Sequence, residues 1–198
     1  QDLTQEEKLF VQQSEPYVVG VLNHNAPYQY VDNSTGEISG ISVDLLKQIA
    51  QSTGLEFVFV TAETWDELLR LMNQGQVQIV AGMPFDYDFA RERELTISQS
   101  YVSSPYMLMA PHSFQGPHSG QRLALMPISA YKERYYIGEV SWYANMEECI
   151  EAVYSGEADY TYVDLYTAQY HLSNVRYNTL DLTPQFYPSR TMCFGLAK

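Results

Sequence analysis

Residues 55–81, LEFVFVTAETWDELLRLMNQGQVQIVA, contain two short apolar runs separated by a helical pattern. The runs at 55–60 and 77–81 combine β-branched and apolar residues, which is typical of buried strands. Between them, residues 64–74 place apolar side chains three and four positions apart, as along one face of a helix. A strand, a helix and a second strand in this order predict a parallel strand pair joined by a crossover helix.

The same pattern extends toward the N-terminus. Residues 17–22, YVVGVL, are predicted to form a buried strand, and residues 42–50 form a helix that leads into the next strand. A hairpin is expected between 28 and 38, and Thr4 with Glu7 forms the capping-box pattern of a short N-terminal helix. The order β-α-β-α-β predicts a parallel, doubly wound sheet.

Ligands of such sheets bind beyond the carboxyl ends of the strands. This rule places the loops near Asn23, at 61–65 and at 82–91 on one rim of the predicted sheet. Residues that contact a ligand are therefore expected in these loops.

A second, smaller α/β unit is predicted after the turn-rich segment PHSFQGPHSG at 111–120. Its expected strands and helices alternate along the chain: a strand at 123–126, a helix from Ser129 or Ala130, a strand at 140–143, a helix at 147–154, a strand at 160–163 and a helix at 165–172.

The closing segment, 190–196, is apolar enough to return to the first unit as a strand. The predicted fold is therefore α/β with two lobes, each a sheet flanked by helices, joined by two hinge crossings near 109–111 and 182–185. The predicted boundaries are residues 1–109 plus 185–198 for lobe 1 and residues 110–184 for lobe 2.

The composition excludes one class of partner. The chain has 198 residues, of which 45% are hydrophobic, enough to bury a core. Its 11 Lys and Arg against 24 Asp and Glu give a net charge of -13, which repels nucleic-acid phosphates. No apolar run reaches the roughly 20 residues that a transmembrane helix needs.

The two cysteines, Cys149 and Cys193, lie in an amphipathic helical pattern and an apolar strand pattern. A thiol in such surroundings behaves as a small hydrophobic group, so two buried free thiols are expected. A disulfide requires close Cα atoms, which the sequence does not show, and the compartment therefore stays open on cysteine usage.

Four stretches, in this order, carry a family resemblance: YVVGVLNHNAPYQY with GEISGISVDLLKQIA, TWDELLRLMNQGQVQIVAG, ARERELTISQSY and IEAVYSGEADYTYVDLYTAQY. They resemble the bacterial extracellular solute-binding proteins of the polar amino acid type. These proteins have the Venus-flytrap fold, which some membrane histidine kinases also use as a sensor. The resemblance spans nearly the whole chain.

The resemblance implies a binding protein on the periplasmic or extracellular side of a membrane. Its expected action is to close around a small solute, an amino acid or a related compound, without a cofactor or a metal. Its expected partner is a membrane-anchored kinase or the permease of an ABC transporter, and the sequence leaves both open. The segment LTQEEKLFVQQ at 3–13 resembles the entry helix of sensor modules and favours the kinase.

In that family an arginine seven residues before the serine of a Phe-Ser…Pro-Tyr element typically grips the ligand carboxylate. Counting back from Ser98 gives Arg91, although Ile97 and Ser100 depart from the family pattern. A guanidinium also matches a carboxylate with two charge-assisted hydrogen bonds. Arg93 is the competing candidate, and the alternative for both is a solvated charge paired with neighbouring glutamates.

The family's second anchor is an aspartate that binds the ligand ammonium, five residues after the Asp of a Gly-x-x-Asp element. Gly156 and Asp159 fit that element, and Asp164 fits the anchor. The alternative for Asp164 is an N-cap of the helix that follows, and the two roles are compatible. By the same resemblance, Ser129 and Ala130 begin a helix that offers backbone N–H groups to the carboxylate, with a plain serine cap as the alternative.

Four further residues are candidates for ligand contact. Trp65 lies where relatives place an aromatic ring against the ligand, and Tyr28 lies in their Pro-Tyr element, with core packing as the alternative. Asn23 and Gly82 lie on the predicted rim, where a turn-forming role is the alternative for Asn23.

Two other functions compete with solute binding. The fold also resembles periplasmic dehydratases that act on cyclohexadienyl acids, with Glu157 or His171 as the acid. However, the four histidines are scattered and no Ser/His/Asp order is present, so the sequence favours a protein that is not an enzyme. The second alternative is a signalling module that has lost its ligand.

Overall fold

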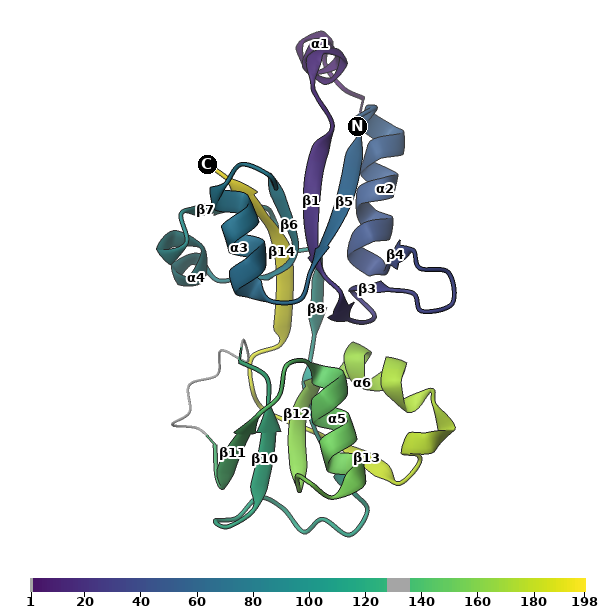
Figure 1. Cartoon of the computed structure of the whole chain (residues 1–198), viewed down its shortest axis with the longest axis vertical. Coiled ribbons are helices and arrows are strands. Elements are labelled where there is room, and N and C mark those ends of the chain that lie inside the picture. The colour runs from purple at the N-terminus through teal and green to yellow at the C-terminus, as the bar shows by residue number, and fades with distance from the viewer. Residues whose placement is uncertain (1, 128–135) are drawn as a thin grey trace. The chain divides into compact units, whose positions relative to one another are not determined.

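The computed structural model describes residues 2–127 and 136–198, which form two compact units (Figure 1). Unit 1 contains Gln1–Val102 and Thr191–Lys198, and unit 2 contains Ser103–Arg190. The chain therefore leaves unit 1 once and returns to it once. The predicted α/β fold of sheets flanked by helices is confirmed.

The sheet of unit 1 has the strand order β5-β1-β6-β14-β7. The strands named in this order are β1 (Tyr17–Leu22), β5 (Phe57–Ala62), β6 (Ile79–Pro84), β7 (Leu95–Ile97) and β14 (Arg190–Ala197), and a sixth strand, β8 (Val102–Ser104), also pairs with β14. Strand β1 pairs in parallel with both β5 and β6, and β14 pairs antiparallel with β6 and β7. The predicted parallel arrangement holds for β5, β1 and β6, and the predicted closing strand returns antiparallel to them.

Helices cover both faces of this sheet, as Figure 1 shows for α2 (Ile41–Thr53) and α3 (Trp65–Asn73). Alternate residues of β6 divide between the two faces, because successive strand side chains point in opposite directions. Val80 joins a buried cluster with Leu68 of α3, whereas Ile79 joins one with Leu46 of α2. The sheet is therefore doubly wound.

Three smaller features complete unit 1. Helix α1 (Gln5–Gln13) begins at Thr4, whose side chain and that of Glu7 form the predicted capping box. The hairpin also forms, with β3 (Gln29–Val31) between β2 (His24–Asn25) and β4 (Ile38–Ser39). Helix α4 (Tyr87–Glu92) was not predicted.

The sheet of unit 2 has the order β11-β10-β12-β9-β13. Its elements are β9 (Tyr106–Pro111), β10 (Arg122–Leu125), β11 (Glu139–Trp142), α5 (Met146–Ser155), β12 (Tyr160–Asp164), α6 (Leu165–Leu172), a 3-10 helix (Val175–Tyr177) and β13 (Leu180–Pro184). Cys149 and Ile150 of α5 pack on one face with Val163, and Leu123 packs with Tyr162 on the other. The predicted helix from Ser129 or Ala130 lies outside the described residues.

The chain crosses between the units in β8 (Val102–Ser104) and at the start of β14. The crossings predicted near 109–111 and 182–185 fall instead within β9 and β13. Strand β9 pairs with β12 on one side and with β13 on the other, so these strands belong to unit 2 along their length. Cys149 and Cys193 are buried free thiols, as predicted.

Candidate functional site

Asn23 lies just beyond the carboxyl end of β1, in unit 1. Its backbone N–H donates to the carbonyl of Ala62, and its side-chain Nδ2 donates to Glu63 Oε1 at 2.9 Å. Asn23 Oδ1 is buried and has no hydrogen-bond partner among the described residues. Asn23 therefore joins the ends of β1 and β5, as expected of neighbouring loops on one rim.

Gly82 lies near the end of β6 and is held by a buried polar network. Its N–H donates to the hydroxyl of Tyr101 at 3.0 Å, and that hydroxyl is 2.6 Å from Ser42 Oγ. Ser42 Oγ in turn donates to Gln29 Oε1 at 2.8 Å. A Cβ on residue 82 would lie 2.1 Å from Gln29 Nε2, and the φ of 71° also requires glycine.

This network was not predicted from the sequence, because its members come from four separate segments. Gln29 and Ser42 are 1% and 0% exposed, so Gln29 Oε1 and Ser42 Oγ depend on each other for a hydrogen bond, whereas Gln29 Nε2 has no partner among the described residues. The network fixes the backbone of Gly82 at the predicted rim.

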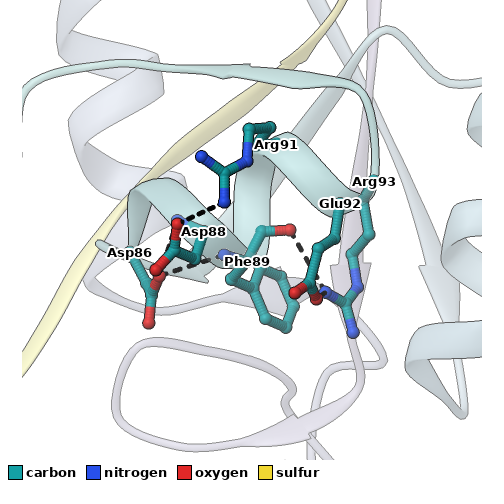
Figure 2. A network of polar contacts seen from close by, with 6 residues as sticks. All are labelled: Asp86, Asp88, Phe89, Arg91, Glu92 and Arg93. Atoms are coloured by element: carbon teal, nitrogen blue, oxygen red, sulfur yellow. Dashed lines mark hydrogen bonds and ion pairs between the residues drawn. The ribbon is translucent and has the colours of Figure 1, made fainter.

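Arg91 and Arg93 occupy different environments at the end of α4 (Figure 2). Arg91 forms an ion pair with Asp88, with 2.8 Å between Nη2 and Oδ1, and its side chain is 77% exposed. Arg93 donates from Nη1 to the carbonyl of Phe89, and its guanidinium carbon lies 3.7 Å from the centre of the Phe89 ring. The Arg93 side chain is only 33% exposed, which makes it a structural contact of α4.

The two aromatic candidates both pack within unit 1. The Trp65 ring meets the Phe89 ring edge to face, with 5.9 Å between centroids, and lies partly buried against the core under α3. Tyr28 is fully buried. The burial of Tyr28 agrees with its core-packing alternative, Trp65 keeps part of its surface exposed, and a ligand contact stays a prediction for both.

Asp164 ends β12 and caps α6, within unit 2. Its Oδ2 accepts from the N–H of Thr167 at 3.3 Å, and its Oδ1 accepts from Thr167 Oγ1 at 2.7 Å. Oδ1 also accepts from Nη1 of Arg190 at 3.0 Å, and Asp164 is 1% exposed. The N-cap alternative is confirmed, whereas the ligand role stays a prediction.

The next N–H groups of α6 also have acceptors in unit 2. Leu165 donates its N–H to the carbonyl of Pro105 at 2.8 Å, and Tyr166 donates to Ser104 Oγ at 3.1 Å. These bonds satisfy donors that a helix start otherwise leaves without partners. Arg190 and Ser104, which hold this end of α6, were not predicted.

The residues considered for an enzyme are placed as follows. Glu157 accepts a hydrogen bond from the Tyr143 hydroxyl, and burial lowers the pKa of His171 on α6.

Within 2–127 and 136–198, no three His, Cys, Asp or Glu side chains gather closely enough to hold a metal ion. Over the same residues, no helix has the length and apolar character to span a membrane. Ser129 and Ala130 lie outside the described residues.

Curated relatives of the chain are sensor proteins. It is 28% identical to the sensor protein EvgS of Escherichia coli O157:H7 over 167 residues, which cover 80% of this chain and 14% of EvgS. It is also 28% identical to the virulence sensor protein BvgS of Bordetella pertussis over 164 residues, covering 78% of this chain and 13% of BvgS. The chain thus spans about a seventh of the length of these relatives.

Solved structures share the fold over almost all of the chain. The periplasmic VFT2 domain of Bordetella pertussis BvgS matches with a TM-score of 0.83 at 21% identity, covering 98% of this chain and 85% of that one. The arginine-bound Gly52Ala mutant of ArgBP from T. maritima matches with a TM-score of 0.77 at 19% identity, covering 96% and 92%. The Venus-flytrap fold expected from the sequence is confirmed.

One protein family matches the first part of the chain. Its model covers residues 17–117, just over half of the 198 residues, from β1 through the segment that follows β9. Three of the four stretches that suggested a family lie within these residues. The chain belongs to the bacterial extracellular solute-binding proteins, family 3.

Proposed function

We propose that this chain binds a small carboxylate-bearing solute, an amino acid or a related compound, as the extracytoplasmic input domain of a membrane-anchored sensor kinase. The sensor role is supported by EvgS and BvgS, which match most of this chain while the chain spans only a small part of each. The solute class is supported by the arginine-bound structure of the same fold.

The observation that carries the proposal is the exposed guanidinium of Arg91. It is paired with Asp88 at the surface, where both side chains are about three-quarters exposed. Such pairs contribute about 0–1 kcal/mol, so a solute carboxylate can replace Asp88 at little cost. Arg93 cannot serve equally, because binding a solute would break its contacts with Phe89.

Arg91 is proposed to bind the carboxylate, and Asn23, Gly82 and Trp65 of unit 1 to contact the rest of the solute. Asn23 Oδ1 is a buried acceptor without a partner among the described residues, and a solute donor would satisfy it once the loop at the end of β1 shifts to expose it. The part of Asp164 in unit 2 is treated below. We also propose that the chain releases its solute unchanged, in keeping with its family of binding proteins.

The test is a thermal-shift screen of the purified chain against amino acids and small carboxylic acids. A solute that binds only the folded chain adds about 2.7 kcal/mol at a hundred times its Kd. Arg91→Ala should abolish the shift. Arg70→Ala is the matched control, because Arg70 is an exposed arginine on α3 of the same unit and should leave the shift intact.

An unchanged shift in Arg91→Ala would show that Arg91 is not the anchor. If no compound of the panel shifts the melting temperature of the parent chain, the alternative of a signalling module that has lost its ligand is favoured. Mass spectrometry of the released solute checks the last part of the proposal, since a changed mass would reveal turnover.

A further inference from the structure

The carboxylate of Asp164 is already neutralised by Arg190. The two side chains form an ion pair of 3.0 Å inside unit 2, and they are 2% and 16% exposed. Asp164 also accepts two hydrogen bonds from Thr167, so three donors converge on its two oxygens. Little of this carboxylate remains for another donor.

A buried ion pair resists the loss of either partner. Removing one leaves an uncompensated charge in a region of low dielectric constant, which is strongly unfavourable. A solute ammonium that took Asp164 would have to displace Arg190, or approach the carboxylate with the guanidinium beside it. In the first case Arg190 would lose its buried counter-charge, and in the second a further positive charge would be added next to a pair whose net charge is zero.

We infer that Arg190 sets the solute specificity of the chain: by occupying Asp164 it excludes an α-ammonium group and selects a carboxylic acid that lacks one. This inference rests on the proposed solute-binding function. Arg190 lies at the very end of unit 2, where the chain turns back into unit 1, and its partner is 26 residues away in the sequence.

The α6 terminus offers little to an ammonium besides Asp164. Its N–H groups at Leu165, Tyr166 and Thr167 are donors, which repel a cation, and each already has an acceptor. These three donors therefore add no negative charge that could balance an ammonium beside Arg190.

The test compares matched pairs of solutes that differ only in the α-amino group: L-glutamate with glutarate, L-alanine with propionate, and L-phenylalanine with 3-phenylpropionate. Calorimetry gives the Kd of each member for the parent chain, Arg190→Gln and Arg190→Lys. The parent should bind the member without the amine at least about tenfold more tightly, because the carboxylate of Asp164 is already paired with Arg190.

Arg190→Gln should shift that ratio toward the amino acid by about tenfold or more, since the ammonium then supplies the missing counter-charge to Asp164. Arg190→Lys keeps a cation and should keep the parental preference. Each variant is judged by the ratio of the Kd values of the two solutes in a pair. A loss of affinity that affects both solutes equally therefore does not change this ratio. If Arg190→Gln fails to fold, the parent and Arg190→Lys still give the preference itself.

Three outcomes contradict the inference in distinguishable ways. A parent that prefers the amino acid of a pair overturns the role of Arg190 and leaves solute binding standing. An unchanged ratio in a folded Arg190→Gln has the same meaning. A parent that binds no member of any pair overturns the inference together with the proposed function.

Discussion

At the scale of the residue, Asp88 is the natural competitor of a solute carboxylate. It holds Arg91 through a single exposed ion pair between residues three positions apart on α4 (Figure 2). The same guanidinium cannot give its best geometry to both carboxylates. Asp88 therefore lowers the affinity of the proposed site for its solute.

Asp88→Asn should strengthen binding of a carboxylate solute by about two- to fivefold, the equivalent of a surface ion pair. Calorimetry on parent and variant measures the change. Glu92→Gln is the matched control, since Glu92 lies 3.6 Å from Arg93 rather than beside Arg91. Weaker binding in Asp88→Asn would show that Asp88 positions Arg91 instead of competing for it.

At the scale of the element, strands β10 and β12 are tied together by one charged pair. Asp159 precedes β12 and accepts from the backbone N–H of Arg122 at 2.7 Å and from its guanidinium at 3.1 and 3.2 Å. These hydrogen bonds from the Arg122 side chain and backbone lower the pKa of Asp159 below its ordinary value of 3.8.

Asp159→Asn should lower the free energy of unfolding by about 1 kcal/mol near neutral pH, a modest loss because both side chains are partly exposed. A depressed pKa stabilises the fold above the ordinary value of 3.8 and loses that contribution as pH falls through the lower folded value. Urea unfolding at pH 7 and in stronger acid should show the parent and variant converging. A constant difference would contradict the pKa shift.

Local sequence patterns predicted the helices and strands whose apolar period and flanking polar residues indicate the same element. Strand β1 and helix α6 occupy the predicted residues, 17–22 and 165–172, because apolar period and flanking polar residues agree there. Helix α4 was missed because its six residues are too short to show a helical period. The crossings were misplaced because the pairing of β9 with β12 and β13 depends on residues far away in the chain.

In the candidate site too, local features were predictable from the sequence, whereas contacts between distant segments were not. Asp164 was recognisable as a cap from the helix after it, whereas its pairing with Arg190 joins two distant segments. The network beneath Gly82 likewise draws Gln29, Ser42 and Tyr101 from separate segments. Contacts of this kind come from tertiary packing, which one sequence does not display.

At the scale of the whole molecule, each unit contains one buried thiol. Cys149 lies in unit 2 and Cys193 in unit 1. Burial raises the pKa of Cys149 to about 12 and that of Cys193 to about 11, which keeps both thiols protonated at neutral pH. The thiols are therefore internal reporters of unfolding, one for each unit.

Neither thiol should react with Ellman's reagent in the native chain, and both should react in guanidinium chloride. At a guanidinium chloride concentration where the thiols react slowly, a bound solute should slow the labelling of each unit that it stabilises. Peptide mapping after brief labelling separates the two sites. Slower labelling of Cys193 alone would restrict solute binding to unit 1, and fast labelling of either native thiol would contradict its burial.

The single departure and single return of the chain make unit 2 an insertion within unit 1. Strand β8, where the chain departs, pairs with β14, where it returns. A genetic exchange of residues 103–190 would therefore replace one whole unit and would cut the sheet of the other only at its margin, within β8 and at the first residue of β14. Asp164 and Arg190 would travel together in such an exchange while Arg91 stayed behind, so a lineage could acquire a new solute preference in one recombination event and retain the proposed carboxylate anchor.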